Sequence, residues 1–216
     1  MTPELERGLR EGLADLGLVL ADAQVSQLLA YQALIAKWNQ VYNLTAVRDP
    51  QEMLTHHLLD SLAVVPPLRQ QLAGRATLLD VGSGAGLPGV VLAITCPELT
   101  VTCVDTVAKK AAFIQQVAVS LGLPHLKGLH ARVETLPGPY DVICSRAFSS
   151  LPDFVKGSRQ ALDPQGVWMA MKGKHPQEEL AALPADVDVF HVEPLTVPGL
   201  SAERCIVWMR LAAQDS

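Results

Sequence analysis

The sequence predicts an α/β protein in which a mostly parallel sheet follows a helical segment. Three observations predict this class. Residues 1 to about 67 show only helical periodicity. Beyond residue 67, short apolar runs alternate with helix-sized segments, as they do where crossover helices join parallel strands. The last two apolar runs are separated by a short turn segment, so they predict a β-hairpin that puts an antiparallel strand into the sheet.

Three helices are expected in the first segment. Their buried stripes comprise Leu5, Leu9, Leu13 and Leu16, then Val25, Leu28, Leu29, Ile35 and Trp38, then Met53, His57, Leu58 and Leu62. We expect Asp22 to be the N-cap of the second helix. The third helix should start near Asp49 and Pro50 and stop at Pro66 and Pro67, because proline fits the first turn of a helix and interrupts a later one.

The rest of the chain alternates between strands and helices. The expected strands are 76–82, 100–105, 125–133, 140–147 and 166–173, with 187–195 and 204–211 as the hairpin. The expected helices are 88–95, 107–121, a much shorter segment at 134–139, and 152–162. The pattern predicts an N-terminal helical cap over 1–67 and a sheet domain over 68–216.

The composition is that of a globular protein, with 49% hydrophobic and 18% charged residues in 216. The sequence contains no apolar run of the roughly 20 residues that a membrane helix needs. Its first residues alternate acidic and basic side chains, unlike a signal or transit peptide. We therefore expect a cytoplasmic protein with no membrane partner. We also expect a monomer. A net charge of −5 argues against binding bare nucleic acid by electrostatics alone.

No metal site is predicted. The cysteines are Cys96, Cys103, Cys144 and Cys205. They lack CxxC spacing, so we interpret them as reduced apolar residues. His56 and His57 are adjacent, and adjacent side chains on a helix point about 100° apart, so both cannot ligate one ion from that face.

The strongest local motif is DVGSGAGLPG, from Asp80 to Gly89. A strand ends, Gly82, Gly84 and Gly86 follow at alternate positions, and a helix starts. Glycine allows a tight turn there and a close approach of the backbone to a ligand at the helix N-terminus. The motif predicts a nucleotide-type cofactor site.

Two cofactors compete for this motif. Gly84, Gly86 and Gly89 also satisfy the GxGxxG pattern of dinucleotide sites, and Asp105 ends the next strand where a ribose-binding carboxylate is expected. S-adenosylmethionine is favoured over NAD because Asp80 stands just before the loop, where methyltransferases use a carboxylate near the methionine ammonium. The predicted closing hairpin is also typical of methyltransferases and not of dehydrogenases.

The third strand ends in Arg132-Val133-Glu134. In this architecture the turn after strand three lies beside the adenine, so the backbone of Val133 and the carboxylate of Glu134 are candidate adenine contacts. The alternative is that Glu134 caps the short helix that follows.

Several segments together resemble one known family. They are WNQVYNLTAVRDPQEMLTHHLLDSL (38–62), DVGSGAGLPG (80–89), Val104-Asp105 with Lys109-Lys110 and Phe113, Arg132-Val133-Glu134, Ser145-Arg146-Ala147-Phe148, and Met171-Lys172-Gly173. Over roughly residues 25 to 205 these motifs are similar, in order, to those of bacterial 16S rRNA guanine-N7 methyltransferases of the methyltransferase G family, formerly called glucose-inhibited division protein B. Thr106 and Lys110 depart mildly from the usual Ser and Arg, and the C-terminal hairpin matches only in outline.

The resemblance implies a class I methyltransferase fold behind a helical cap. It implies transfer of a methyl group from S-adenosylmethionine to N7 of a guanine in a decoding-region hairpin loop of 16S rRNA. The cofactor contacts that it implies are Gly82, Leu87, Val133, Glu134 and Arg146, with Asp105 on the ribose. Together with Asp80, Gly84 and Gly86 from the loop, these are the candidate cofactor-binding residues.

Guanine N7 carries a free lone pair, so the reaction needs no general base, and we assign no catalytic residue. The basic side chains Arg132, Arg146, Lys172 and Lys174 lie at or just beyond the ends of predicted strands, where ligands bind in parallel α/β sheets. We expect Arg132, Lys172 and Lys174 to bind RNA phosphates and Arg146 and Lys172 to position the reactants, although each could be a solvated surface charge. Phe148 could stack on the target base or simply pack at the strand end.

The polar and aromatic residues of the cap are interpreted as structural. His57, with Asp60 and Ser61, is expected to hold the cap onto the glycine loop. Trp38, Asn39 and Asn43 are interpreted as packing and turn residues of the same interface, and contact with RNA is the alternative.

Two alternatives in function remain open from the residues alone. One is a methyltransferase that acts on another RNA, a small molecule or a protein. The other is a non-catalytic nucleotide-binding ribosome assembly factor. Because the chain is acidic overall, an RNA substrate is expected to be recognised by shape within a small-subunit particle.

Overall fold

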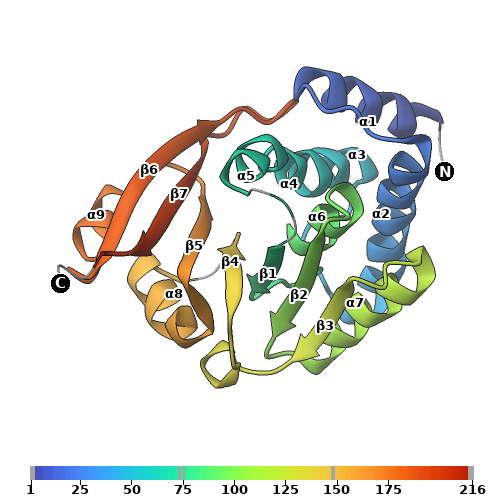
Figure 1. Ribbon diagram of the computed structural model, residues 1–216. Helices are drawn as coiled ribbons and strands as arrows, with labels where there is room; N and C mark the ends of the chain where they lie inside the picture. The colour runs from blue at the N-terminus through green and yellow to red at the C-terminus, as the bar shows by residue number, and fades with distance from the viewer. Residues whose placement is uncertain (1–2, 73, 75, 147–148, 214–216) are drawn as a thin grey trace.

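The computed structural model describes residues 3–72, 74, 76–146 and 149–213, and it contains one seven-stranded sheet flanked by helices (Figure 1). The strands are β1 (Ala76–Val81), β2 (Leu99–Asp105), β3 (Leu126–His130), β4 (Tyr140–Ser145), β5 (Leu162–Lys172), β6 (Val187–Leu195) and β7 (Arg204–Leu211). Their order across the sheet is β3-β2-β1-β4-β5-β7-β6. Each predicted strand is present, most within two residues of its expected bounds.

The strand directions also follow the prediction. β1, β2, β3, β4 and β5 run parallel, whereas β7 pairs antiparallel with both β5 and β6. The start of β7 therefore lies at the same edge as the carboxyl ends of the parallel strands. β5 begins four residues before the expected position 166, because Leu162 already pairs with Tyr140.

The cap is built from short and long helices. They are α1 (Pro3–Asp15), α2 (Asp22–Tyr42), α3 (Pro50–Met53), the π-helix η1 (Leu54–Leu59), α4 (Asp60–Leu62) and α5 (Val65–Gln71). α3 starts at Pro50 as predicted. Asp49 is its N-cap, since its carboxylate accepts from the backbone of Gln51 and Glu52 at 2.9 and 3.0 Å.

Two expectations for the cap were wrong. Asp22 is the first residue of α2 and not its N-cap; its carboxylate instead accepts from Arg10. Pro66 and Pro67 do not end the third helical stretch, which ends at Leu62. They lie in the first turn of α5, where proline loses no helical hydrogen bond. The boundary expected at residue 67 thus falls within α5.

The remaining helices are α6 (Gly89–Thr95), α7 (Ala108–Leu121), η2 (Val133–Thr135), α8 (Leu151–Ser158), η3 (Arg159–Ala161) and α9 (Gln177–Ala181). The sequence did not predict α9, which has too few residues to show a periodic apolar face. No helix of the described residues is long and apolar enough to cross a membrane.

Side-chain alternation along the strands divides the core in two. Leu78 and Met169 face the cluster that contains α6, α7 and the cap, whereas their neighbours Leu79 and Trp168 face the cluster that contains α8. Buried residues of α1, α2, η1 and α5 belong to the same cluster as those of the sheet. The cap therefore shares one hydrophobic core with the sheet.

Candidate active site

A cavity of about 400 Å³ lies at the carboxyl ends of β1, β2 and β3. It is lined by Val81, Gly82, Val104, Asp105, Thr106, Val107, Lys110, Ala131, Arg132, Val133 and Glu134. Four predicted cofactor residues, Gly82, Asp105, Val133 and Glu134, are thus brought together from three strand ends. We call this space the nucleoside cavity.

The glycine loop contributes Gly82 to the wall of the nucleoside cavity and continues into α6. Gly84 has φ +60 and a side chain there would meet only open space, whereas a side chain at Gly86 (φ +92) would lie 2.4 Å from Val90. Gly84 therefore leaves room beside the loop, and Gly86 lets α6 pack close. The backbone N–H of Gly84 donates to Asp105 Oδ2 at 3.0 Å, which joins the loop to the end of β2.

Asp105 is held in place from both sides. Its Oδ1 accepts from the backbone N–H of Val107 at 2.9 Å, and Lys110 Nζ lies 3.7 Å from its Oδ2. The side chain is only 7% exposed yet lines the cavity. A carboxylate fixed in this way presents its remaining lone pairs to hydroxyl donors such as those of a ribose.

Glu134 lies at the far wall, in η2. It does not cap this short helix; its carboxylate instead lies 3.5 Å from Arg132 Nε, and both side chains are exposed. The side chain of Val133 is buried. The alternative that Glu134 serves as a helix cap is therefore wrong, and its carboxylate borders the nucleoside cavity.

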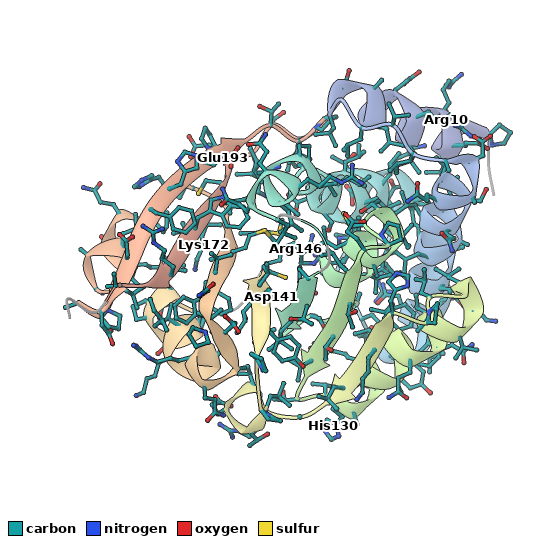
Figure 2. The ribbon with its side chains drawn as sticks, viewed as in Figure 1. Arg10, His130, Asp141, Arg146, Lys172 and Glu193 are labelled. Atoms are coloured by element: carbon teal, nitrogen blue, oxygen red, sulfur yellow. The ribbon has the colours of Figure 1, made fainter. Side chains whose placement is uncertain are left out.

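A second pocket, of about 350 Å³, lies beyond the end of β4 at the same edge of the sheet. It is lined by Asp60, Arg146, Met171, Lys172, Gly173 and Arg204. Figure 2 shows Arg146 between the end of β4 and the cap helices, and Lys172 at the end of β5. We call this space the basic pocket.

Each cation of the basic pocket has an acidic partner. Asp60 accepts from Arg146 Nη1 at 3.1 Å and from Arg204 Nε at 2.8 Å. Lys172 Nζ donates to Glu179 of α9 at 2.8 Å and to the Ser149 carbonyl at 3.1 Å. Lys172 was expected to be open to RNA, and the structure instead pairs it with Glu179.

The other predicted RNA-binding residues do not all reach this pocket. Arg132 lines the nucleoside cavity, and its side chain is 74% exposed. Lys174 is exposed and directly follows Gly173, which lines the basic pocket. Phe148 lies outside the described residues.

Asp80 is not at the surface of either cavity. It is fully buried, and its Oδ2 accepts from the backbone N–H of Gly89 at 2.9 Å, at the start of α6. Burial raises its pKa to about 7, an effect that the Gly89 hydrogen bond opposes. Along β1, Asp80 shares the face of Leu78, so its side chain is directed toward α6 and the cap.

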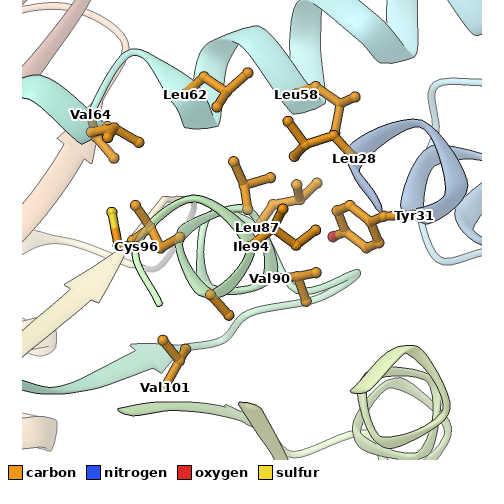
Figure 3. Close-up of a cluster of buried hydrophobic side chains, with 14 of the residues drawn as sticks. Leu28, Tyr31, Leu58, Leu62, Val64, Leu87, Val90, Ile94, Cys96 and Val101 are labelled. Atoms are coloured by element: carbon orange, nitrogen blue, oxygen red, sulfur yellow. The ribbon is translucent and has the colours of Figure 1, made fainter. Parts of the chain in front are cut away.

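Leu87 has its side chain in the hydrophobic core. It lies among Leu28, Tyr31 and Leu62 of the cap and Val90 of α6 (Figure 3). The side chain is 4% exposed. The contact with the cofactor that the resemblance implies for Leu87 would therefore have to come from its backbone.

The cap is joined to the glycine loop by a residue that the sequence did not single out. Tyr31 of α2 is fully buried and donates through its hydroxyl to the Ala85 carbonyl at 2.6 Å. A tyrosine within an apolar helical stripe looks like a core residue, and only the buried polar end of its side chain hints at this contact.

His57 and Asp60 were expected to hold the cap onto the glycine loop, and this was wrong. His57 Nε2 is 2.8 Å from Thr45 Oγ1 within the cap, and burial lowers the pKa of His57 to about 4. Asp60 instead binds Arg146 at the end of β4 and Arg204 at the start of β7. Ser61 Oγ is buried without a partner among the described residues.

Three other cap residues have the predicted packing and turn roles, but within the cap and against α7 and not against the glycine loop. Trp38 packs against Tyr42 and Phe113 with ring centroids 5.2 and 5.3 Å away. Asn39 accepts from the Thr45 backbone, and Asn43 ends α2 in the left-handed conformation at φ 49.

The four cysteines are free and buried, and burial raises the pKa of each thiol. In the described part of the chain, no group of three or more His, Cys, Asp or Glu side chains could hold a metal ion.

Solved structures share the fold of this chain at low sequence identity. TrmN from Thermus thermophilus superposes with a TM-score of 0.56 and 19% identity, covering 73% of this chain and 53% of that chain. A SAM dependent methyltransferase from Aquifex aeolicus gives 0.54 and 20%, covering 74% and 93%. These likenesses agree with the class I, Rossmann-like fold expected from the sequence.

Sequence comparisons are more specific. A family model described as rRNA small subunit methyltransferase G matches residues 24–207. The ribosomal RNA small subunit methyltransferase G of Acidovorax ebreus (strain TPSY) is 69% identical over 218 residues, covering 97% of this chain and 96% of the relative. The protein of the same name from Polaromonas sp. (strain JS666 / ATCC BAA-500) is 70% identical over 210 residues, covering 95% and 93%. With these matches, the chain belongs to the rRNA small subunit methyltransferase G family.

Proposed function

We propose that the protein transfers the methyl group of S-adenosylmethionine to N7 of a guanine in 16S rRNA, in the decoding-region hairpin loop. The observation that carries this proposal is the placement of two cavities at one edge of the sheet, on either side of the end of β4. One is bordered by a glycine loop and a fixed carboxylate, and the other by three cations. A cofactor and an anionic substrate can therefore meet at the end of β4.

The nucleoside cavity fits the nucleoside half of S-adenosylmethionine. Asp105 offers carboxylate oxygens suited to ribose hydroxyls, and the apolar side chains of Val104 and Val133 flank space for the adenine. Gly82 and Gly84 would leave the backbone of the loop accessible to the bound cofactor, since Gly82 is exposed and a side chain at Gly84 would meet open space. Asp80 supports this site from within the core, because its carboxylate accepts from the backbone N–H of Gly89, the first residue of α6.

When bound, S-adenosylmethionine supplies an electrophilic methyl group on a positively charged sulfur. The chain's own task is to align the guanine N7 lone pair with that methyl group, and alignment alone can supply about 7–11 kcal/mol of a barrier. No proton has to leave N7 for the attack. The residues therefore act by position. Arg146 and Lys172 hold the substrate in the basic pocket, and Arg146, which does not line the nucleoside cavity, remains a candidate cofactor contact from that side. Arg132 and Lys174 extend the cationic surface at the rim.

The substrate is proposed to be the rRNA within a small-subunit particle, and the protein to act as a monomer in the bacterial cytoplasm, where rRNA is modified. A net charge of −5 makes tight binding to bare RNA unfavourable away from the basic pocket. Recognition of a folded particle by shape would compensate for this.

The test is to incubate the purified protein with methyl-labelled S-adenosylmethionine and small subunits from cells that lack the enzyme. We expect label in 16S rRNA, and cleavage at a single guanine after borohydride reduction and aniline treatment, which reports N7-methylguanine. Asp105→Ala should lose the thermal stabilisation by S-adenosylmethionine, which reaches about 2.7 kcal/mol at 100 times the Kd. Stabilisation by NAD alone, or label only in small molecules or protein, would refute the proposal.

A further inference from the structure

The basic pocket is organised around a single buried carboxylate, that of Asp60 in α4. This side chain is 3% exposed, and its two oxygens accept from different arginines. Arg146 comes from the end of β4 and Arg204 from the start of β7. Asp60 thus joins the cap to two strands that are distant in sequence.

Stability does not explain this arrangement well. Burying charges costs free energy that the ion pairs only about recover, so apolar residues of the same size would often serve as well or better. One carboxylate between two guanidinium groups also leaves a net positive charge at the pocket wall. What the arrangement does provide is fixed orientation, because a guanidinium is planar and its donors point in set directions.

The contacts also determine which donors remain for a ligand. Arg146 Nη1 donates to the His56 carbonyl at 2.7 Å as well as to Asp60, and Arg204 Nη1 donates to the Glu203 carbonyl at 2.9 Å. Toward the residues that the structure describes, the Nη2 group of each arginine makes no hydrogen bond. Both arginines line the pocket and are 23% exposed. An RNA phosphate is a ligand that two such donors can bind.

Asp60 follows a π-helix of the cap. The π-helix η1 ends at Leu59, directly before Asp60, and within it His56 offers its carbonyl to Arg146. Single π-turns in helices often occur at functional sites, because they redirect the side chains that follow. Here the π-turn directs both the His56 carbonyl and the Asp60 carboxylate to one guanidinium.

We propose that Asp60 is a positioning residue for methyl transfer. It fixes Arg146 and Arg204 so that they hold a phosphate of the target nucleotide in the basic pocket. Because Asp60 belongs to the cap, the two arginines are oriented only while the cap is packed against the sheet. The inference rests on the proposed function and extends it to a residue of the cap and to Arg204. Asp60 itself does not touch the reacting atoms.

The decisive variant is Asp60→Asn, which keeps the size of the side chain and removes its charge. We expect kcat for methylation of small subunits to fall at least tenfold, while thermal stabilisation by S-adenosylmethionine persists. Affinity for a hairpin RNA should stay equal or become tighter, with a salt slope steeper by about 0.7–0.9 unit, since one negative charge has been removed from the binding surface. The control is Asp186→Asn, which removes an exposed partner of Arg159 and should leave kcat and slope unchanged.

A second pair of variants separates positioning from folding. Arg204→Lys keeps the charge and should lower kcat without changing the salt slope. Arg204→Gln is compared with Asp60→Asn and with the double variant Asp60→Asn/Arg204→Gln. The loss of kcat in the double variant should be smaller than the product of the two single losses, because Asp60→Asn already releases Arg204. Multiplicative losses, or an Asp60→Asn protein with wild-type kcat and only a lower Tm, would overturn the inference.

The wild-type protein tests the proposed function separately. If it methylates small subunits and Asp60→Asn does so equally well, the inference fails and the proposed function stands. If the wild type labels no rRNA, the proposed function fails. An unchanged salt slope in Asp60→Asn would then overturn the inference as well.

Discussion

At the scale of single residues, the buried Asp80 makes stability depend on pH. Its folded pKa of about 7 lies above the ordinary value of 3.8, so the folded state holds a proton that the unfolded state releases between these values. Its contribution to stability is therefore greatest at low pH and is lost as pH rises toward 7. Three pKa units correspond to at most about 4 kcal/mol.

Comparison with Asp80→Asn tests this. We expect the Tm of wild type, relative to the variant, to fall from pH 4 to about pH 7 and then to level off, in the absence of cofactor. His57 has the opposite effect, since its lowered pKa destabilises the fold as pH falls from 6.5 toward 4, but it is present in both proteins and cancels. A Tm difference that stays constant over this range would show that Asp80 is ionised in both states.

Lys172 offers a second prediction, because Glu179 partly neutralises it at 2.8 Å. Glu179→Gln keeps an acceptor for the Leu151 backbone and frees the lysine charge. We expect tighter RNA binding with a steeper salt slope, and the reverse for Lys172→Ala, by about 0.7–0.9 unit each. Lys127→Ala serves as control because Lys127 lies near the start of β3, at the opposite edge of the sheet. Equal slopes in all variants would show that Lys172 does not contact RNA.

At the scale of elements, Tyr31 connects α2 to the glycine loop. Tyr31→Phe removes the donor to the Ala85 carbonyl and leaves that buried acceptor unsatisfied, at a cost of about 1–3 kcal/mol. We expect a lower Tm and a severalfold weaker affinity for S-adenosylmethionine, measured by calorimetry. Tyr42→Phe, at a ring that is 38% exposed, should change neither. Unaltered affinity in Tyr31→Phe would mean that the loop keeps its shape without the cap.

The elements themselves were largely predictable, for physical reasons. Buried parallel strands appear in the sequence as short apolar runs. The glycine loop and Asp105 indicate the edge of the sheet where ligands bind. The antiparallel hairpin was predicted too, and it already implied that the first residue of the last strand lies at that edge. Arg204 could have been found from this signal.

Other parts of the site could not be read in this way. Helical periodicity gives no indication of the π-turn that aims Asp60 at two arginines. Nor does it distinguish Tyr31 from a core residue. The position of Asp80 before the loop does not show which face its side chain takes, whereas strand alternation puts it on the same face as Leu78.

At the scale of the whole molecule, the chemistry predicts an unusual insensitivity to pH. With saturating cofactor and small subunits, the single-turnover rate of methylation should be nearly flat from about pH 6 to 9, because guanine N7 needs no base. Asp80 titrates within this range, so Asp80→Asn is the necessary control: any pH dependence that vanishes in it reflects Asp80 and not a base. A methylation rate that rises tenfold per pH unit in both proteins would show that the methylated atom is not N7.

The buried cysteines have a practical consequence. All four thiols are enclosed and have raised pKa values, so almost no thiolate is present at neutral pH to react with maleimides. We therefore expect the four native cysteines not to react during site-specific labelling of an introduced cysteine. A cysteine introduced at Val19, which is 95% exposed on the cap, would take up a fluorophore alone, and a second one on the exposed Lys127 of β3 would report the distance between cap and sheet as RNA binds.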